Sequence, residues 1–379
     1  MFSDIFGGKN TFIHNELIHL KDEFEILYLA LEEIPNDRLK KSFSNFKIIP
    51  YKEGKIIKKL KWWLWKADFY LSFRNRLFAK TLKQVVDDFS PEVIHLQFGY
   101  EALKFLDNYY DVNQSYIIHF HGYGASALFR KKSYLKRLKY YLAKKNISQI
   151  HVSNFIKTRF ENYALDTSRV SIIKCGVDLS IFTQKEFKTN DDEFIFTQVS
   201  SQVEKKGVPY TIKGFALFQK EFPHYQAKLF ITGEASLKNK QLITDLNLEH
   251  NVLFTGLLNH QEVQQLLKNT DIFIHPSITS SKGDEEGIPT AIMEAIACGL
   301  PVISTKHAGI PELVTDELNA ILVHEKDALE IKSALYSMIR TPLKKVNTHQ
   351  YLKVKCFDLD SHLQQISSLY NKLSNSRLN

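Results

Sequence analysis

The sequence predicts an α/β protein in which two doubly wound domains, each built on a parallel sheet, follow one another and face a cleft. Short apolar segments with strand character alternate with segments of helical periodicity. This alternation stops at the polar residues 183–193 and then starts again. Strands that alternate with helices favour parallel sheets covered by helices on both faces. A length of 379 residues also favours two domains over one.

The first domain should open with a helix followed by a strand, in residues 10–30. Two buried strands that end in glycine-containing turns are expected at 91–98 and 115–124. Residues 146–160 have the pattern of a strand, a Ser-Asn helix cap and a helix, and residues 170–182 that of a strand and a turn.

The start of this domain is unusual. Gly7-Gly8 follows only MFSDIF, whereas a doubly wound domain normally places a buried strand before its glycine-rich turn. Either the first strand is very short or the natural start lies upstream, and we expect the second.

The second domain repeats the pattern, with helices expected at 208–222 and from Pro289 to Cys298. Proline suits the first position of a helix, and Gly299 suits the position just past its end. The strands of this domain are expected at 194–200, 227–234, 251–256, 271–277 and 301–305.

The composition is that of an ordinary folded chain, with 44% hydrophobic and 24% charged residues. Cys175, Cys298 and Cys356 are far apart and form no Cys-x-x-Cys or Cys/His cluster, so neither a disulfide framework nor a structural zinc is expected. The N-terminus lacks the basic head and apolar core of a secretory signal, and no apolar run approaches the roughly 20 residues that span a bilayer. We therefore expect a cytoplasmic protein.

The net charge of +8 is concentrated in two basic segments. Residues 52–80 carry nine Lys and Arg against two acids, together with Trp62, Trp63 and Trp65, and residues 130–145 carry eight Lys and Arg and no acid. Lysine stems and tryptophan rings suit a membrane interface, so these segments predict docking on an anionic membrane surface. The alternative is solvated lysines over packed tryptophans. No nucleic-acid partner is expected, because no segment resembles a nucleic-acid module.

The stretch DEEGIPTAIMEAIACGLPVIST, residues 284–305, predicts a loop containing Glu286, a helix with Glu294 in its second turn, and a strand. A helix start binds phosphate through its unpaired N–H groups, and Gly287 lets a ligand approach the backbone closely. An ionised carboxylate only accepts hydrogen bonds, so acids beside a phosphate suit hydroxyl groups. The stretch therefore predicts a nucleotide-sugar site, with the diphosphate at the helix start and a sugar at each glutamate. Taken alone, the two glutamates also fit a loop acid and a solvated helix acid.

This stretch resembles the signature of the retaining family-4 glycosyltransferases of GT-B fold. NTFIHNELIHL, PEVIHLQFG, FHGYGAS, HVSNFIKTRF and IIKCGVDLSIF resemble the acceptor domain of the subgroup that acts in bacterial exopolysaccharide and lipopolysaccharide assembly. VEKKGVPYTIKGF, LFITGE, VLFTG, IFIHPS and GIPELV resemble its donor domain, and FDLDSHLQQISSLYNKL resembles the C-terminal helix that crosses back onto the first domain. The resemblance implies a Rossmann-like acceptor domain at 1–180 that also takes 357–379, and a nucleotide-sugar donor domain at 181–356.

The resemblance also implies a role for each matching residue. Glu286 falls at the contact to the donor sugar, and Glu294 at the contact to the nucleotide ribose. Lys206 falls at the lysine that binds the diphosphate, and His121 beside the donor sugar and the acceptor. The other implied donor-site residues are Lys205, Ser201 and the backbone of Gly287, Ile288, Pro289 and Thr290, while Gly7 and Gly8 form an acceptor-side loop. Without the motifs, His121 fits a core histidine, the two lysines a solvated turn, and the two glycines a simple turn.

Two positions depart from the family pattern. Ser200-Ser201-Gln202 stands in place of a Gly-Arg whose arginine pairs with the phosphates, and a hydroxyl does not replace a bidentate guanidinium. Lys205 is the candidate for a second point charge there. Gly124 stands where the subgroup often has aspartate. No Asp-x-Asp motif follows a donor-domain strand, and Asp284 is a weak metal candidate, so we expect no metal and no cofactor.

The implied reaction moves a hexose-type sugar, with retention, from a nucleotide-sugar, UDP-linked rather than GDP-linked, to a sugar hydroxyl of a lipid-linked precursor of a bacterial surface glycan. Such a hexosyltransferase is expected at the inner face of the cytoplasmic membrane. Two alternatives remain open. One is a catalytically weak partner subunit of a glycosyltransferase complex, which the missing arginine favours. The other is a sugar-nucleotide epimerase of similar fold.

Overall fold

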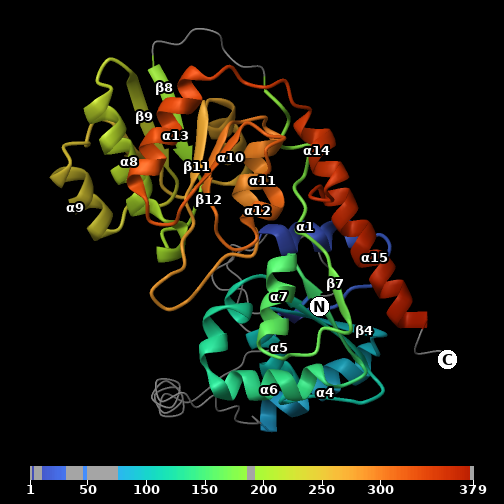
Figure 1. The fold of residues 1–379 in the computed structure, drawn as a ribbon. Coiled ribbons are helices and arrows are strands. Elements are labelled where there is room, and N and C mark those ends of the chain that lie inside the picture. The colour runs from blue at the N-terminus through green and yellow to red at the C-terminus, as the bar shows by residue number, and fades with distance from the viewer. Residues whose placement is uncertain (1, 4–10, 31–45, 49–75, 186–192, 376–379) are drawn as a thin grey trace. The chain divides into compact units, whose positions relative to one another are not determined.

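The structure is a computed structural model that describes residues 2–3, 11–30, 46–48, 76–185 and 193–375 (Figure 1). Gly7, Gly8 and residues 52–75 of the first basic segment lie outside the described residues. The chain divides into two compact units. Unit 1 comprises Met1–Lys174 and His362–Asn379, and unit 2 comprises Cys175–Ser361. We had expected the first boundary after residue 180.

Unit 1 is built on a parallel sheet whose described strands follow the order β3-β2-β1-β4-β5-β6-β7. These strands are β1 (Phe2–Ser3), β2 (Tyr28–Ala30), β3 (Phe46–Ile48), β4 (Val93–Gln97), β5 (Ser115–Phe120), β6 (Ile147–His151) and β7 (Val170–Ile172). The described helices are α1 (Thr11–Leu20), α4 (Arg76–Phe89), α5 (Gly99–Leu106), α6 (Lys132–Leu142), α7 (Asn154–Asn162) and the greater part of α15 (Leu359–Asn375), with short 3-10 turns at Tyr123–Ala125 and Ala127–Arg130.

The central strands of unit 1 are buried along almost their whole length, because both faces of the sheet are covered. In β5, every residue after Ser115 is buried, which is typical of parallel strands. The helix that follows β6 begins where the sequence predicted, since the Ser153 hydroxyl accepts a hydrogen bond from the Ile156 N–H at 3.3 Å.

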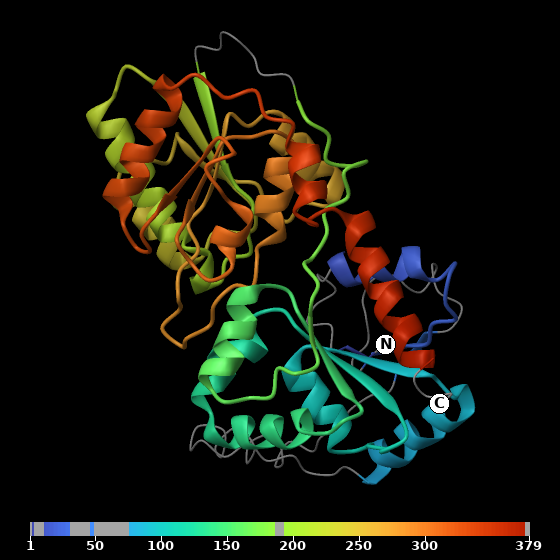
Figure 2. The ribbon, with the colours of Figure 1, turned by 45° about the vertical axis from the view of Figure 1, so that its right-hand side comes forward.

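The C-terminal helix packs on unit 1 along most of its length. It lies beside α1 (Figure 2), where His362 Nε2 is 3.3 Å from Glu16 Oε2. Ile366 shares a buried cluster with Ile117 and Ile150 of the sheet. The Tyr370 hydroxyl is 2.6 Å from His95 Nδ1 of β4.

Unit 2 is built on a second parallel sheet, whose strands within the described residues follow the order β10-β9-β8-β11-β12-β13. They are β8 (Glu193–Gln198), β9 (Gln226–Ile231), β10 (Val252–Phe254), β11 (Ile272–His275), β12 (Val302–Thr305) and β13 (Ala320–Val323). The helices described in this unit are α8 (Val208–Glu221), α9 (Leu237–Asp245), α10 (His260–Lys268), α11 (Thr290–Ala297), α12 (Ile310–Leu313), α13 (Ala328–Arg340) and α14 (Thr348–Val354), with a 3-10 turn, η4, at Glu204–Lys206.

Helices cover both faces of the unit 2 sheet. Figure 1 shows α8 and α13 on one face and α11 on the other. A Cβ atom at Gly214 of α8 would lie 2.5 Å from Ile331 Cγ2 of α13, so only glycine allows these two helices to pack this closely. The two halves therefore have the predicted doubly wound α/β architecture, with all described strand pairs parallel.

Several elements are shorter than the sequence predicted. Strand β11 ends at His275, before Pro276, whereas we expected it to reach residue 277. Helix α11 begins at Thr290, and Pro289 occupies its N-cap with a ψ of 123°, not its first helical position. At the other end, Gly299 with a φ of 80° follows the helix, as predicted.

Candidate active site

The candidate site lies at the carboxyl ends of β8 and β11, where the strand order of unit 2 reverses. The sheet continues from β8 through β9 and β10 in one direction, and through β11, β12 and β13 in the other. Ligands of doubly wound sheets bind outside the strand ends at such a reversal. The turn after β8 carries Lys205 and Lys206, and the segment between β11 and α11 carries residues 284–289.

Gly207 allows the lysine turn to lie directly against the segment that follows β11. Its φ of 66° is in the left-handed region, and a Cβ atom there would lie 1.8 Å from the Pro276 carbonyl oxygen. The buried Gln198 fixes the same turn, because its Nε2 donates to the Lys206 carbonyl at 2.7 Å. Its Oε1 accepts from the Thr211 hydroxyl at 2.6 Å. The two lysines are therefore held by the backbone of their own turn.

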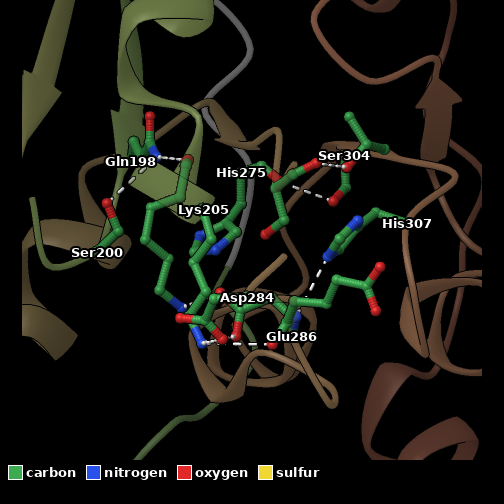
Figure 3. Close-up of polar contacts among 12 residues, drawn as sticks. Gln198, Ser200, Lys205, His275, Asp284, Glu286, Ser304 and His307 are labelled. Carbon is green, nitrogen blue, oxygen red and sulfur yellow. Dashed lines mark hydrogen bonds and ion pairs between the residues drawn. The ribbon is translucent and has the colours of Figure 1, made fainter. Parts of the chain in front are cut away.

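The two lysines form a tight ionic cluster with the acids of the facing loop, and Figure 3 shows Lys205 beside Asp284 and Glu286. Lys206 Nζ is 2.7 Å from Glu286 Oε1, and Lys205 Nζ is 3.7 Å from Glu286 Oε2 and 3.2 Å from Asp284 Oδ1. Burial alone would raise the pKa of Glu286, but Lys206 and Lys205 outweigh it and lower that pKa to about 2. The Glu286 carboxylate is thus ionised at neutral pH although its side chain is only 9% exposed.

The loop that carries Glu286 is anchored to the strand ends by hydrogen bonds. The Ser304 and Thr305 hydroxyls of β12 donate to the carbonyls of His275 and Ser277, at 2.7 and 2.5 Å. The Glu286 backbone N–H donates to His307 Nε2 at 3.2 Å (Figure 3). We had assigned no role to His307.

The N-terminus of helix α11 directly follows this loop. No side-chain hydrogen bond caps the N-terminus of this helix, which lies wholly within the described residues. Its first N–H groups thus suit a bound anion. The residues leading into it, Gly287, Ile288 and Pro289, are buried, and Thr290 is half-buried.

Glu294 is in the opposite electrostatic state from Glu286. It is half-buried in the second turn of α11, and burial raises its pKa to about 7. The two glutamates of the motif are therefore not equivalent acids. One is ionised before any ligand binds, and the other is close to half-protonated at neutral pH.

His121 lies in unit 1, just after β5. Its Nε2 donates to Gln97 Oε1 at 2.7 Å, and its ring stacks on that of His119 with centroids 4.0 Å apart. Burial, with a smaller effect of His362, lowers the pKa of His121 to about 3, so its imidazole is neutral. We had not singled out Gln97. The sequence does carry a signal for it, because His95 and Gln97 are polar residues at alternate positions of an otherwise apolar strand.

The structure thus brings Lys205, Lys206 and Glu286 together, with Glu294 on the adjoining helix. Ser201 is exposed in the turn between β8 and η4. Asp284, which we had considered a weak metal candidate, instead binds Lys205. Among the described residues, no group of three or more His, Cys, Asp and Glu side chains is arranged to hold a metal ion.

Residues 181–353 match the profile of the family described as Glycosyl transferases group 1. This range contains the lysine turn, the Glu286 loop and α11. The matched range makes up most of unit 2.

The chain is also similar to proteins whose names refer to the biosynthesis of bacterial polysaccharides. The putative colanic acid biosynthesis glycosyltransferase WcaL of Salmonella typhimurium is 31% identical over 189 residues, which are 50% of this chain and 47% of the relative. The amylovoran biosynthesis glycosyltransferase AmsK of Erwinia amylovora is 31% identical over 167 residues, which are 44% of this chain and 41% of the relative. The chain spans about half the length of the curated relatives it matches.

The fold of the whole chain is that of GT-B glycosyltransferases. The crystal structure of Anabaena HepE, in complex with UDP and glucose, covers 98% of each chain with a TM-score of 0.74 at 17% identity. The GT-B fold predicted from the sequence is therefore confirmed. In the described part of the chain, no helix combines the length and apolar character needed to cross a membrane.

Proposed function

We propose that this protein is a retaining glycosyltransferase that moves a hexose-type sugar from a nucleotide-sugar to a sugar hydroxyl of a bacterial surface-glycan precursor. The observation that carries the proposal is the ionised Glu286, held by Lys206 and Lys205 beside the uncapped start of α11. A carboxylate accepts hydrogen bonds from sugar hydroxyls, while ammonium groups and helix N–H groups bind phosphate oxygens.

The chemistry assigned to these residues is stabilisation of the leaving group. The bond between the sugar anomeric carbon and the phosphate oxygen breaks, and a bond from that carbon to the acceptor oxygen forms on the same face. The acceptor proton passes to the departing phosphate oxygen. Lys206 and the start of α11 would stabilise the charge that develops on the diphosphate. Glu286 would orient the donor sugar, Glu294 the ribose, and His121 the sugar and acceptor.

The donor proposed is UDP-linked, and neither a metal nor a cofactor takes part in our proposal. UDP and glucose occupy the similarly folded HepE, which supports the choice of nucleotide. The names of WcaL and AmsK, which refer to colanic acid and amylovoran biosynthesis, support an exopolysaccharide product. The acceptor proposed is lipid-linked, at the inner face of the cytoplasmic membrane.

Helix α6 supports docking on an anionic membrane. Lys132, Lys136 and Lys139 are exposed and lie on one face at i, i+4 and i+7, opposite the buried Tyr134 and Leu138. Each basic group near an anionic surface contributes about 1 kcal/mol, so reversing all three charges should weaken vesicle binding by about 100-fold or more. The assay is flotation with vesicles of anionic phospholipid at low salt. A control variant reverses two exposed lysines of another helix, Lys238 and Lys240 of α9. No flotation of the wild type would exclude membrane docking.

The test of the reaction is nucleotide release from a panel of UDP- and GDP-sugars, with and without a membrane lipid extract as acceptor, in the presence and absence of EDTA. Release with one donor, enhanced by the extract and unaffected by EDTA, is expected. Glu286→Ala should lower turnover by about 100-fold or more. Near-normal turnover in this variant would remove Glu286 from the proposed role.

Lys206→Met tests the leaving-group contact, and Lys332→Met is its matched control. Both lysine side chains are 16% exposed, and both pair with a glutamate at 2.7 Å, Lys332 with Glu221. Only the Lys206 variant should lose turnover.

A second candidate function is that of a partner subunit with little turnover of its own. The observation that favours it is Ser201, which stands where an arginine is expected, combined with the engagement of Lys205 by Asp284. Calorimetry with UDP separates the two functions. Nucleotide binding without release from any donor would favour the partner subunit, whereas release from one donor would exclude it.

A further inference from the structure

We propose that His307 and Glu325 are a pair of positioning residues that hold the Glu286 loop in its donor-binding conformation. This inference rests on the proposed function, since it assigns Glu286 to the donor sugar. His307 follows β12 and is 1% exposed, and Glu325 follows β13. Neither residue belongs to the motifs that predicted the site.

The contacts of His307 select one form of its ring. The Glu286 N–H can only donate, so His307 Nε2, at 3.2 Å, must accept. The ring proton then lies on Nδ1, which donates to Glu325 Oε1 at 2.6 Å. A neutral imidazole protonated on Nδ1 satisfies both contacts. An imidazolium would have no lone pair for the Glu286 N–H.

Glu325 ties His307 to a second point of the same loop. Its Oε2 accepts from the Thr279 N–H at 2.7 Å, and the Thr279 hydroxyl lies 3.3 Å from both Glu325 Oε1 and Glu285 Oε1. The segment after β12 adds a backbone contact, in which the Gly309 N–H donates to the Gly287 carbonyl at 3.1 Å. The ends of β11, β12 and β13, which are neighbours in the sheet, are thereby joined on both sides of Glu286.

The loop needs this support because the contacts that hold the Glu286 side chain are ionic, and their lysines are shared with the ligand. Glu286 is held through its side chain by Lys206 and Lys205. A bound diphosphate attracts the same ammonium groups and so competes with that anchor. The hydrogen bond from the Glu286 N–H to His307 involves no ligand-binding group. It therefore keeps the Glu286 carboxylate in place when Lys205 and Lys206 bind the phosphates of the ligand.

The experiment compares three variants of the full chain. His307→Gln keeps an acceptor and a donor on one carboxamide, so it can bridge the Glu286 N–H and Glu325. His307→Phe has a ring of similar shape with neither group. His324→Ala is the matched control, because His324 also pairs with a glutamate through Nδ1, Glu330 at 2.7 Å, but is exposed.

Two readouts are measured on each variant. Amide hydrogen exchange of the peptide containing Glu286 needs no substrate. It should accelerate about fivefold or more in His307→Phe, and stay near the wild-type rate in His307→Gln and His324→Ala. With donor present, kcat should fall about tenfold or more in His307→Phe, while the Kd for free UDP stays within about threefold, because UDP lacks the donor hexose that Glu286 would hold. His307→Gln should recover most of kcat.

The ring form gives an independent check. Nitrogen-15 spectra of the wild type should show the His307 proton on Nδ1. A proton on Nε2, or equal losses in His307→Gln and His307→Phe, would overturn the proposal. If the wild type releases nucleotide from no donor, the proposed function fails. In that case the exchange rates and the ring form still decide whether the pair holds the loop.

Discussion

Replacing Glu294 by glutamine should stabilise the protein at pH 8 and leave its stability nearly unchanged at pH 4. Burial raises the pKa of Glu294 from 4.5 to about 7. In the unfolded chain the carboxyl group ionises near 4.5, so between these two pH values the folded state binds a proton that the unfolded state has lost. Stability therefore falls as the pH rises through this window.

The magnitude follows from the width of that window. Each unit of pKa corresponds to about 1.4 kcal/mol, so a displacement from 4.5 to about 7 is worth at most about 3 kcal/mol, and the full loss is present at pH 8. Glutamine fills the same space without ionising. The free energy of unfolding of Glu294→Gln should thus exceed that of the wild type by up to about 3 kcal/mol at pH 8.

Urea titrations followed by circular dichroism at pH 4 and pH 8 measure this difference. The expected result is a gap between variant and wild type that opens as the pH rises. A gap of the same size at both pH values, or a less stable variant at pH 8, would refute the assignment of a raised pKa to Glu294.

Three further predictions concern the same domain. Glu286→Gln should act in the opposite direction, because the pKa of Glu286 is lowered from 4.5 to about 2. This variant should be less stable than the wild type by up to about 3 kcal/mol at neutral pH. Urea titrations should show the difference closing as the pH falls from 5 to 2. Gly207→Ala should lower the free energy of unfolding by several kcal/mol, because the new methyl group clashes with the Pro276 carbonyl and the backbone is strained as well. Gly256→Ala, at a φ of 74° with no atom within 4 Å, should lower it by about 1 kcal/mol. Equal melting temperatures of the two variants would contradict this reasoning. Calorimetry should show that the affinity for UDP rises between pH 6 and 8 as Glu294 ionises, and that Glu294→Gln binds more weakly with no such rise; a flat wild-type profile would separate Glu294 from the ribose.

Much of the fold follows from local patterns. Apolar runs such as FIFTQVS and DIFIHPS are short and alternate with amphipathic helices, and this is enough to predict parallel sheets. The ends of these strands were harder to place, because the hydrogen bonds between strands can stop before the apolar character of the sequence does. Thus β11 stops at His275 although Ile278, three residues on, is also buried.

The candidate site could be predicted only in part. Glu286, Glu294 and Lys206 lie in motifs whose residue types suggest their chemistry. His307 and Glu325 do not, because their contacts join residues 21 and 18 positions apart and depend on which strands are neighbours. Strand order is set by the packing of the entire sheet, and local periodicity carries no information about it. The same holds for Asp284, whose partner Lys205 is 79 residues away.

The two glutamates differ in their ionisation, and this difference would affect how the site binds a nucleotide-sugar. Glu286 is ionised by lysines on a turn that Gly207 and Gln198 hold rigid, so its carboxylate is ready to accept hydroxyl hydrogen bonds before the ligand arrives. No such cation shifts the pKa of Glu294, which is raised by burial alone. A hydroxyl pair that donates to Glu294 would therefore favour its ionised form and release a proton near neutral pH. On this reasoning the sugar half of the site is preorganised by the protein, while the ribose half is completed by the ligand, and the free energy needed to ionise Glu294 lowers the affinity for any nucleotide that lacks those hydroxyls.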